Sequence, residues 1–229
     1  HQELEGAQTL LQLPRRVAPH GRRFRGVAPR VELDGELARR FQALADRNNA
    51  SLFTTLLSAF FVLLHRYTGS QDVLVGSGVA NRRWQDTEGL LGMFVNTVVL
   101  RGRLEGDPSF EEFLARVRRT TLEVYDHQEL PYEQIFAQSP ARHQGGLNPL
   151  IQSMFSFHDS SVGTLDASPL EVSFVEGLGN GSAKFELSVV AVPLYSEPGH
   201  IQRLAGDVVR IPRSEAPVRS SPRASLSGI

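Results

Sequence analysis

The stretch from Leu52 to about Arg66 constrains the fold more than any other part of the sequence. Apolar residues occupy nearly every face of a helix drawn through it, and Thr54, Thr55 and Ser58 are the interruptions. A helix that is hydrophobic all round lies in the interior of a domain. The chain has 229 residues, which is enough for one large domain or two small ones at roughly 100–200 residues each. We therefore expect a globular protein built around this helix.

Two further helices flank the central one in the predicted order of elements. The apolar spacing after the Asp34-Gly35 turn predicts a helix over about 36 to 47. Asp107-Pro108 predicts the start of the other, because an Asp oxygen caps a first turn and the proline lacks only an N–H that has no helical partner there. Leu130-Pro131 is expected to end it.

Five runs of residues have the pattern of strands, and they are separated from the helices by turn residues. They are Val73 to Val79, Phe94 to Leu100, Ile151 to Phe157, Leu170 to Val175 and Phe185 to Leu194. Helices and strands mix without strict alternation, so the predicted fold class is α/β with a mixed sheet.

The composition excludes several classes of protein. There is no Cys, so disulfide frameworks, thiolate zinc sites and thiol nucleophiles are absent. A formal net charge of −1 gives no reason to expect nucleic acid or anionic lipid as a partner. The longest apolar stretch is shorter than the roughly 20 residues that a bilayer span needs. We expect a soluble, cytoplasmic protein with no nucleic-acid or membrane partner.

The two ends of the chain differ in character from the middle. Residues 14 to 30 carry six arginines and no acidic residue, which is typical of a basic arm or of a solvated connector. No aromatic stacking pattern accompanies the arginines, so the connector is favoured. Residues 207 to 229 are rich in Arg, Ser and Pro without periodicity, and we expect a disordered tail there.

Residues for the common catalytic and metal sites do not occur together. The seven histidines form no H-E-x-x-H or H-x-x-x-H pair, and neither a G-x-S-x-G motif nor a phosphate-binding G-x-x-x-x-G-K-[ST] motif is present. His158 and Asp159 are neighbours on a predicted strand, so they face opposite sides of it. We therefore assign no catalytic residue and no metal ligand.

Asn96 is the polar residue that most needs an explanation. It lies in the β-branched run that includes Val95, Val98 and Val99. A carboxamide buried there needs its hydrogen bonds to be made. Asn96 therefore either binds neighbouring backbone or lines a polar cavity.

Three strings, in this order and at this spacing, resemble the later core motifs of condensation domains from nonribosomal peptide synthetases. They are Gly92 to Arg101 (GMFVNTVVLR), His127 to Glu133 (HQELPYE) and Asn148 to Phe157 (NPLIQSMFSF). Supporting matches flank them at 63–69, 71–76, 106–110 and 183–187. The resemblance covers roughly residues 8 to 206.

The resemblance implies a chloramphenicol-acetyltransferase-like architecture, in which two similar α/β lobes form a V with a tunnel between them. In that family, acyl and aminoacyl thioesters enter on the phosphopantetheine arms of carrier proteins and are joined by an amide bond, with no cofactor bound directly. The family's catalytic signature, H-H-x-x-x-D-G, lies in the first lobe, and this sequence contains no His-His pair. The chain thus resembles the second lobe alone, inactive without the first.

This resemblance divides the chain and assigns residues to a site. Residues 1–30 would connect to the missing N-terminal lobe, 31–206 would be the C-terminal lobe, and 207–229 the tail. The expected tunnel residues are Asn96, Thr97 and Gln152. The expected structural residues of the motifs are Gly92, Arg101, His127, Gln128, Pro131, Glu133 and Lys184. The implied partners are the first lobe, carrier proteins and a neighbouring adenylation domain.

Two alternatives stay open. One is a non-catalytic relative that binds a carrier protein or recruits another enzyme, and the other is a sibling chemistry such as epimerisation or ester formation. An H-H-x-x-x-D-G motif upstream of His1 distinguishes the catalytic interpretations from the non-catalytic one. After Leu187 the sequence departs from the family pattern, because residues 196–200 lead directly to Ile201 without the usual further strand and aromatic turn.

Overall fold

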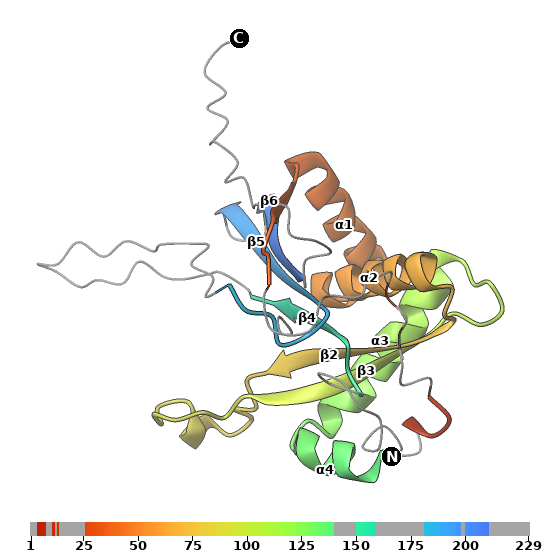
Figure 1. Ribbon diagram of the computed structural model, residues 1–229. Coiled ribbons are helices and arrows are strands. Elements are labelled where there is room, and N and C mark those ends of the chain that lie inside the picture. The colour runs from red at the N-terminus through yellow and green to blue at the C-terminus, as the bar shows by residue number, and fades with distance from the viewer. Residues whose placement is uncertain are drawn as a thin grey trace, which may run out of the picture.

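A mixed sheet of six strands organises the described part of the chain (Figure 1). The computed structural model describes residues 4–7, 11, 13, 26–139, 150–158, 181–197 and 200–210. The strand order is β1-β6-β5-β4-β2-β3, and β4 runs parallel to β2 and β5 while the other neighbours are antiparallel. In chain order the strands are Arg30–Leu33, Asp72–Val79, Asn96–Arg103, Ser153–Phe157, Leu187–Glu197 and His200–Arg210. The predicted α/β class with a mixed sheet is confirmed.

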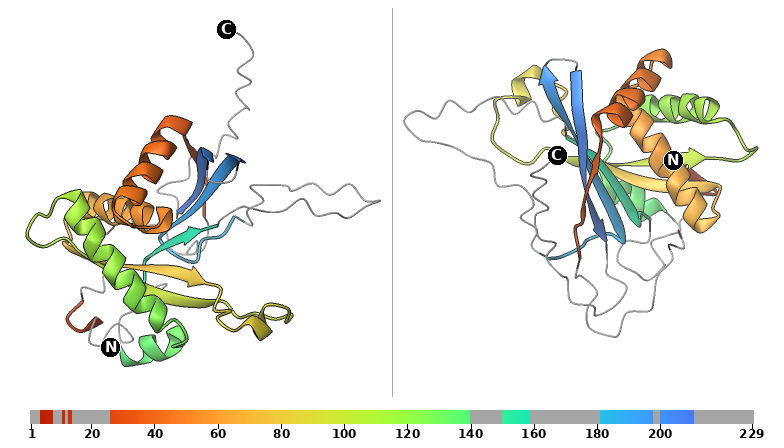
Figure 2. Two further views of the ribbon diagram at one scale, coloured as in Figure 1. Left: turned by 180° about the vertical axis from the view of Figure 1, so that it is seen from behind. Right: turned by 90° about the horizontal axis from the view of Figure 1, so that it is seen from above.

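Three helices, α1 (Gly35–Arg47), α2 (Leu52–Thr68) and α3 (Phe110–Asp126), lie on one side of the sheet (Figure 2). As predicted, α2 begins after Ser51, whose hydroxyl accepts a hydrogen bond from the backbone N–H of Thr54 at 3.1 Å. No single described helix is long and apolar enough to cross a membrane, and α1 with α2 meets those criteria only as a pair bent by 107°.

The start of α3 differs from the prediction. Its N-cap is Ser109, not Asp107. The Ser109 hydroxyl accepts a hydrogen bond from the Glu112 N–H at 3.3 Å, and the Glu112 carboxylate accepts one from the Ser109 N–H at 2.8 Å. This reciprocal capping box satisfies two backbone donors at once, which a lone Asp cap does not do. Asp107 instead occupies a left-handed turn with φ of +49°.

The end of α3 also differs from the prediction. The helix stops at Asp126, four residues before Leu130. A short further helix, α4 (Tyr132–Gln138), follows at once with Pro131 as its N-cap residue. Proline fixes its own φ near the helical value and needs no N–H partner at a helix start. Leu130-Pro131 therefore separates two helices and begins the second.

Apolar residues pack on both faces of the sheet. The first cluster fills the space between the sheet and the helices, where the rings of Phe61 and Phe113 meet edge to face at 6.2 Å. The second cluster contains Leu74, Val99, Leu150 and Ile151, with residues of α4 packed against it. Successive residues of β2 point alternately into the two clusters, so consecutive residues of this strand are apolar.

Several predicted strands change at their ends. Strand β3 begins at Asn96, two residues later than predicted, and Val95 is exposed. Strand β6 continues to Arg210, so the tail predicted from residue 207 starts too early by four residues. Those four residues pair with β5, and Asp207 also pairs with Arg30 of β1. The predicted strand from Leu170 to Val175 lies outside the described residues.

Candidate functional site

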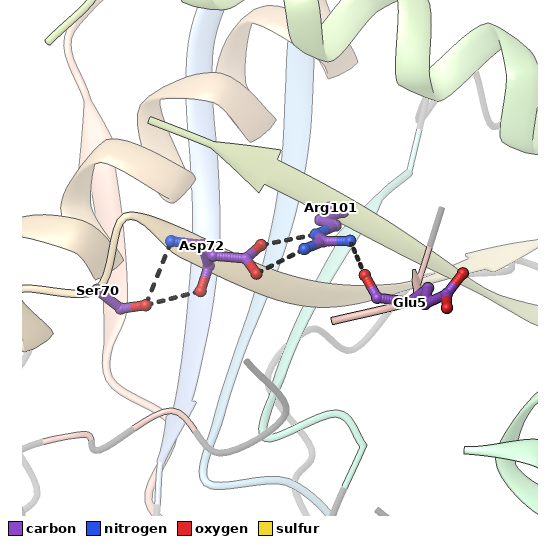
Figure 3. Close-up of polar contacts among 4 residues, drawn as sticks. All are labelled: Glu5, Ser70, Asp72 and Arg101. Atoms are coloured by element: carbon purple, nitrogen blue, oxygen red, sulfur yellow. Dashed lines mark hydrogen bonds and ion pairs between the residues drawn. The ribbon is translucent and has the colours of Figure 1, made fainter. Parts of the chain in front are cut away.

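Arg101 and Asp72 form a nearly buried ion pair on the sheet face opposite the long helices (Figure 3). Arg101 Nε and Nη2 donate to the two carboxylate oxygens of Asp72 at 2.7 and 2.8 Å. The side chains are 8% and 14% exposed. Arg101 Nη1 also donates to the backbone oxygen of Glu5 at 3.2 Å. The bidentate contact fixes the plane of the guanidinium. As a result, Nη1 points toward the N-terminal segment.

Asn96 makes all of its observed hydrogen bonds with backbone. Its Nδ2 donates to the carbonyl oxygens of Gln128 and Leu130, both at 2.8 Å, and its Oδ1 accepts from the N–H of Tyr132 at 3.3 Å and of Thr97 at 2.9 Å. These contacts correspond to the backbone-binding alternative of the sequence prediction. They join the start of β3 to the connection between α3 and α4.

Gln152 lies immediately before β4 and is buried, with 6% of its surface exposed. Its Oε1 accepts a hydrogen bond from the backbone N–H of Leu11 at 3.0 Å. Its own carbonyl oxygen accepts from the N–H of Glu186 at 3.0 Å. Gln152 therefore connects the N-terminal segment to the middle of the sheet.

Gly92, an expected structural residue of the motifs, belongs to an apolar segment between β2 and β3, and sequence reasoning did not assign Leu90 and Leu91 of that segment to the site. Arg82 donates to the carbonyl oxygens of Thr87 and Gly92, and its guanidinium lies 4.3 Å from the ring centroid of Phe94. These contacts hold a segment that projects away from the helices (Figures 1 and 2). A signal for it was present, because the sequence 90–95 (LLGMFV) is apolar before the strand begins.

The other predicted motif residues lie on helix ends and exposed surface. His127 is the exposed C-cap of α3, and Gln128 Nε2 donates to the carbonyl oxygen of Tyr125 at 2.9 Å. Glu133 is exposed in the first turn of α4, and Lys184 is exposed before β5. The structure thus brings Asn96, Gln128 and Pro131 together at the connection between α3 and α4. Lys184 does not belong to this group, because it precedes β5.

Two titratable groups in the described part of the chain have shifted pKa values, and both belong to α3. The pKa of Glu112 is lowered, first by the hydrogen bond from the Ser109 backbone and then by that from its hydroxyl. Burial raises the pKa of the Tyr125 phenol, whose ring stacks on Phe53 at 6.2 Å. Among the described residues, no group of His, Asp and Glu could hold a metal ion. Of the predicted tunnel residues, Asn96 and Gln152 make the side-chain hydrogen bonds described above with backbone groups.

Comparisons with known proteins place this geometry in a family. The family model described as Condensation domain matches residues 1–201. A linear gramicidin synthase of Brevibacillus parabrevis is 40% identical over 193 residues, which are 83% of this chain and 4% of that protein. The complex of the X-domain and OxyB from teicoplanin biosynthesis matches with a TM-score of 0.77 and 22% identity, over 91% of this chain and 45% of that one.

A second solved structure has the same fold. The first condensation domain of the CDA synthetase matches with a TM-score of 0.58 and 17% identity, over 81% of this chain and 40% of that chain. The chain therefore spans less than half the length of these solved relatives and a few per cent of the gramicidin synthase. The mixed α/β sheet is that of the chloramphenicol-acetyltransferase-like fold. This chain belongs to the condensation-domain family of nonribosomal peptide synthetases.

Proposed function

We propose that the chain is the C-terminal lobe of a condensation domain and forms one wall of the tunnel in which carrier-bound thioesters are joined by an amide bond. The observation that carries the proposal is the extent of the match. The chain matches the X-domain chain over 91% of its own length but over only 45% of that chain. The family's His-His motif does not occur in the sequence, so a complementary lobe supplies it.

The exposed apolar segment between β2 and β3 supports the proposal that a second lobe binds here. Leu91 and Met93 are 103% and 92% exposed, and three neighbouring residues are also exposed, namely Trp84, Leu90 and Val95. Large exposed apolar patches on soluble proteins mark interaction sites. Arg82 holds the segment in place without burying these side chains. In this proposal the complementary lobe covers them.

The predicted tunnel residues keep defined roles within this proposal. Asn96 and Thr97 begin β3 directly after the apolar segment. In this proposal, that end of the lobe faces the tunnel. Asn96 acts there by positioning the connection between α3 and α4. Gln152 positions the N-terminal segment beside the same sheet. The reacting thioesters arrive on phosphopantetheine arms of carrier proteins, one of them loaded by the neighbouring adenylation domain.

The test compares the chain alone with a two-lobed chimera. The chimera joins the first lobe of the matching gramicidin synthase condensation domain to this chain. Two loaded carrier proteins are mixed with each protein, and dipeptidyl thioester is followed by mass spectrometry. We expect product from the chimera and none from the chain alone, because general-base catalysis needs a positioned proton acceptor. Product from the chain above the buffer control would contradict the proposal.

One observation favours a second candidate function. The X-domain, which matches this chain with a TM-score of 0.77, was solved bound to OxyB. If the chain is a non-catalytic member that recruits a partner enzyme, the chimera would be inactive although carrier proteins still bind to it.

A variant of the chimera in which both histidines of the first lobe are replaced by alanine is the matched control. Chiral analysis of any product separates condensation from epimerisation.

A further inference from the structure

The two halves of the sheet are joined by little backbone pairing. Within the described residues, β2 and β4 pair only at Gly76 and Met154, whereas β2 and β3 pair along their whole length. A Cβ on Gly76 would overlap the sulfur of Met154, so any larger residue there has to displace that side chain. Parallel pairing is stable when a ladder of hydrogen bonds repeats along the strands. This junction therefore needs support from outside the sheet.

The N-terminal strap, which comprises the described residues 4–7, 11 and 13, contacts the chain on both sides of this junction. The carbonyl oxygen of Glu5 accepts from Arg101 of β3 at 3.2 Å, and the N–H of Leu11 donates to Gln152, which precedes β4, at 3.0 Å. The strap thus holds one half of the sheet at each of its ends.

Burial accompanies both anchors. Leu4 and Ala7 pack against the second cluster, which includes residues from both halves of the sheet. Leu11 is 6% exposed within the first cluster, and Leu13 packs against it. The predicted connector of residues 1–30 therefore begins with a segment that is part of the core.

The anchors recognise backbone and apolar side chains. Arg101 contacts the carbonyl of Glu5, whose side chain is exposed, and Gln152 contacts the N–H of Leu11. The pairing of Arg101 with Asp72 fixes the position of the guanidinium that donates to Glu5 (Figure 3). A seat of this kind selects a segment that starts with a hydrogen-bonded turn, in which the Ala7 N–H donates to the Leu4 carbonyl at 3.2 Å. It also requires apolar residues at the positions of Leu4, Ala7 and Leu11.

We propose that this face of the lobe is a peptide seat whose occupant is the strap, and that the seated strap holds the two half-sheets together. Arg101 and Gln152 are positioning residues for it. The inference holds whether or not the chain acts as a condensation lobe. If it does, the connection from the first lobe is fixed on the sheet and does not swing freely.

The test starts from the full chain, folded before it is cut. A recognition site for a specific protease replaces residues 18–24, which lie outside the described residues. After cleavage, retention of the N-terminal fragment is followed by native mass spectrometry and size exclusion on dilution. We expect the fragment to stay bound to the lobe. Hydrogen exchange at the amides of Gly76 and Met154 should accelerate when the fragment is diluted away.

Substitutions within the strap do not change the sequence of the rest of the chain, so a change in retention reports on the strap itself. Leu11→Pro removes the donor to Gln152 and should weaken retention at least about tenfold, the effect of one lost buried hydrogen bond. Glu5→Ala is the matched control, because only the carbonyl of Glu5 is used, and retention should stay within about threefold of the unsubstituted fragment. Release of the unsubstituted fragment, equal retention of both variants, or unchanged exchange at the junction would each overturn the proposal.

Discussion

Asn96 fixes the connection between α3 and α4 through hydrogen bonds to backbone, so replacing it should lower the stability of the fold. Asn96→Ala removes the donors to Gln128 and Leu130 and leaves both carbonyls without that partner. Because the site is part-buried, water can partly replace the lost donors, and we expect a total loss of about 1–3 kcal/mol in the free energy of unfolding. Urea denaturation of the two proteins measures it.

A second variant separates the donors from the acceptor. Asn96→Asp keeps an oxygen for the N–H of Tyr132 and Thr97 but presents no amide donor to the carbonyls. It should destabilise at least as much as alanine, because a carboxylate then faces carbonyl oxygens. An alanine variant with the unfolding midpoint of the original chain would place the stabilising contacts elsewhere.

The sequence could predict that Asn96 needs hydrogen-bond partners but not which ones. An amide in a β-branched run is conspicuous by composition alone. Its partners lie more than 30 residues further on, at a connection whose shape depends on where α3 stops. Arg101 has the same limitation, because its contact with Glu5 joins residues 96 positions apart. Long-range pairing of polar groups leaves no periodic signal.

At the scale of elements, the capping box at the start of α3 makes stability depend on pH. The pKa of Glu112 lies below its ordinary value of 4.5, first because of the Ser109 backbone hydrogen bond. A carboxylate whose pKa is lowered in the folded state stabilises it above that ordinary value, and this contribution disappears as the pH falls through the folded pKa. Glu112→Gln should therefore reduce the loss of stability on acidification below about pH 4.5.

The measurement is a series of urea midpoints from neutral to acidic pH. Glu111→Gln is the matched control, since Glu111 occupies the same turn without the bond to Ser109. Ser109→Ala should lower stability at neutral pH by about 1 kcal/mol, the usual loss for a removed N-cap. A Glu112→Gln variant whose acid transition overlays that of Glu111→Gln would contradict the assignment.

Strand β6 predicts a sharp difference between two truncations. A chain ending at Gly206 loses the pairing of Asp207 to Arg210 with β5, and the hydrogen bond from the Val208 N–H to the Pro29 carbonyl at 3.0 Å. A chain ending at Arg210 keeps both. With about 2–4 °C of melting temperature per kcal/mol for a chain of this size, we expect the shorter chain to melt at least about 4 °C lower. Equal melting temperatures would show that this end of β6 adds no stability.

The elements that could be predicted are those whose signal is local. The central helix α2 has its apolar faces, its Ser51 cap and the Gly69 stop within one segment, so its bounds follow from that segment alone. Strand β6 mixes Arg, Gly and Asp, and it is a strand because β5 and β1 lie beside it. Tertiary context decides strand formation more than propensity does. For the same reason, strand β1 is not predicted. The sequence predicts a connector up to residue 30, whereas β1 begins at Arg30.

At the scale of the whole molecule, the described part of the chain has one well-covered side and one apolar projection. Helices cover one face of the sheet, and the N-terminal strap with α4 covers part of the other (Figures 1 and 2). The segment carrying Leu91 and Met93 extends beyond both layers. Leu91 and Met93 contribute little to the stability of this fold, because they bury almost no surface in it. Their contribution is expected only in a larger assembly.

Leu91→Glu with Met93→Glu tests this at the scale of the assembly. Because both side chains are almost fully exposed, the stability of the chain should change by no more than about 0.5 kcal/mol. In the two-lobed chimera the same charges would enter an apolar contact, so amide formation should fall at least about tenfold through the loss of lobe docking. Tyr67→Glu on α2, also exposed, is the control that should leave product formation unchanged. Full activity of the double variant would mean that the complementary lobe does not cover this segment.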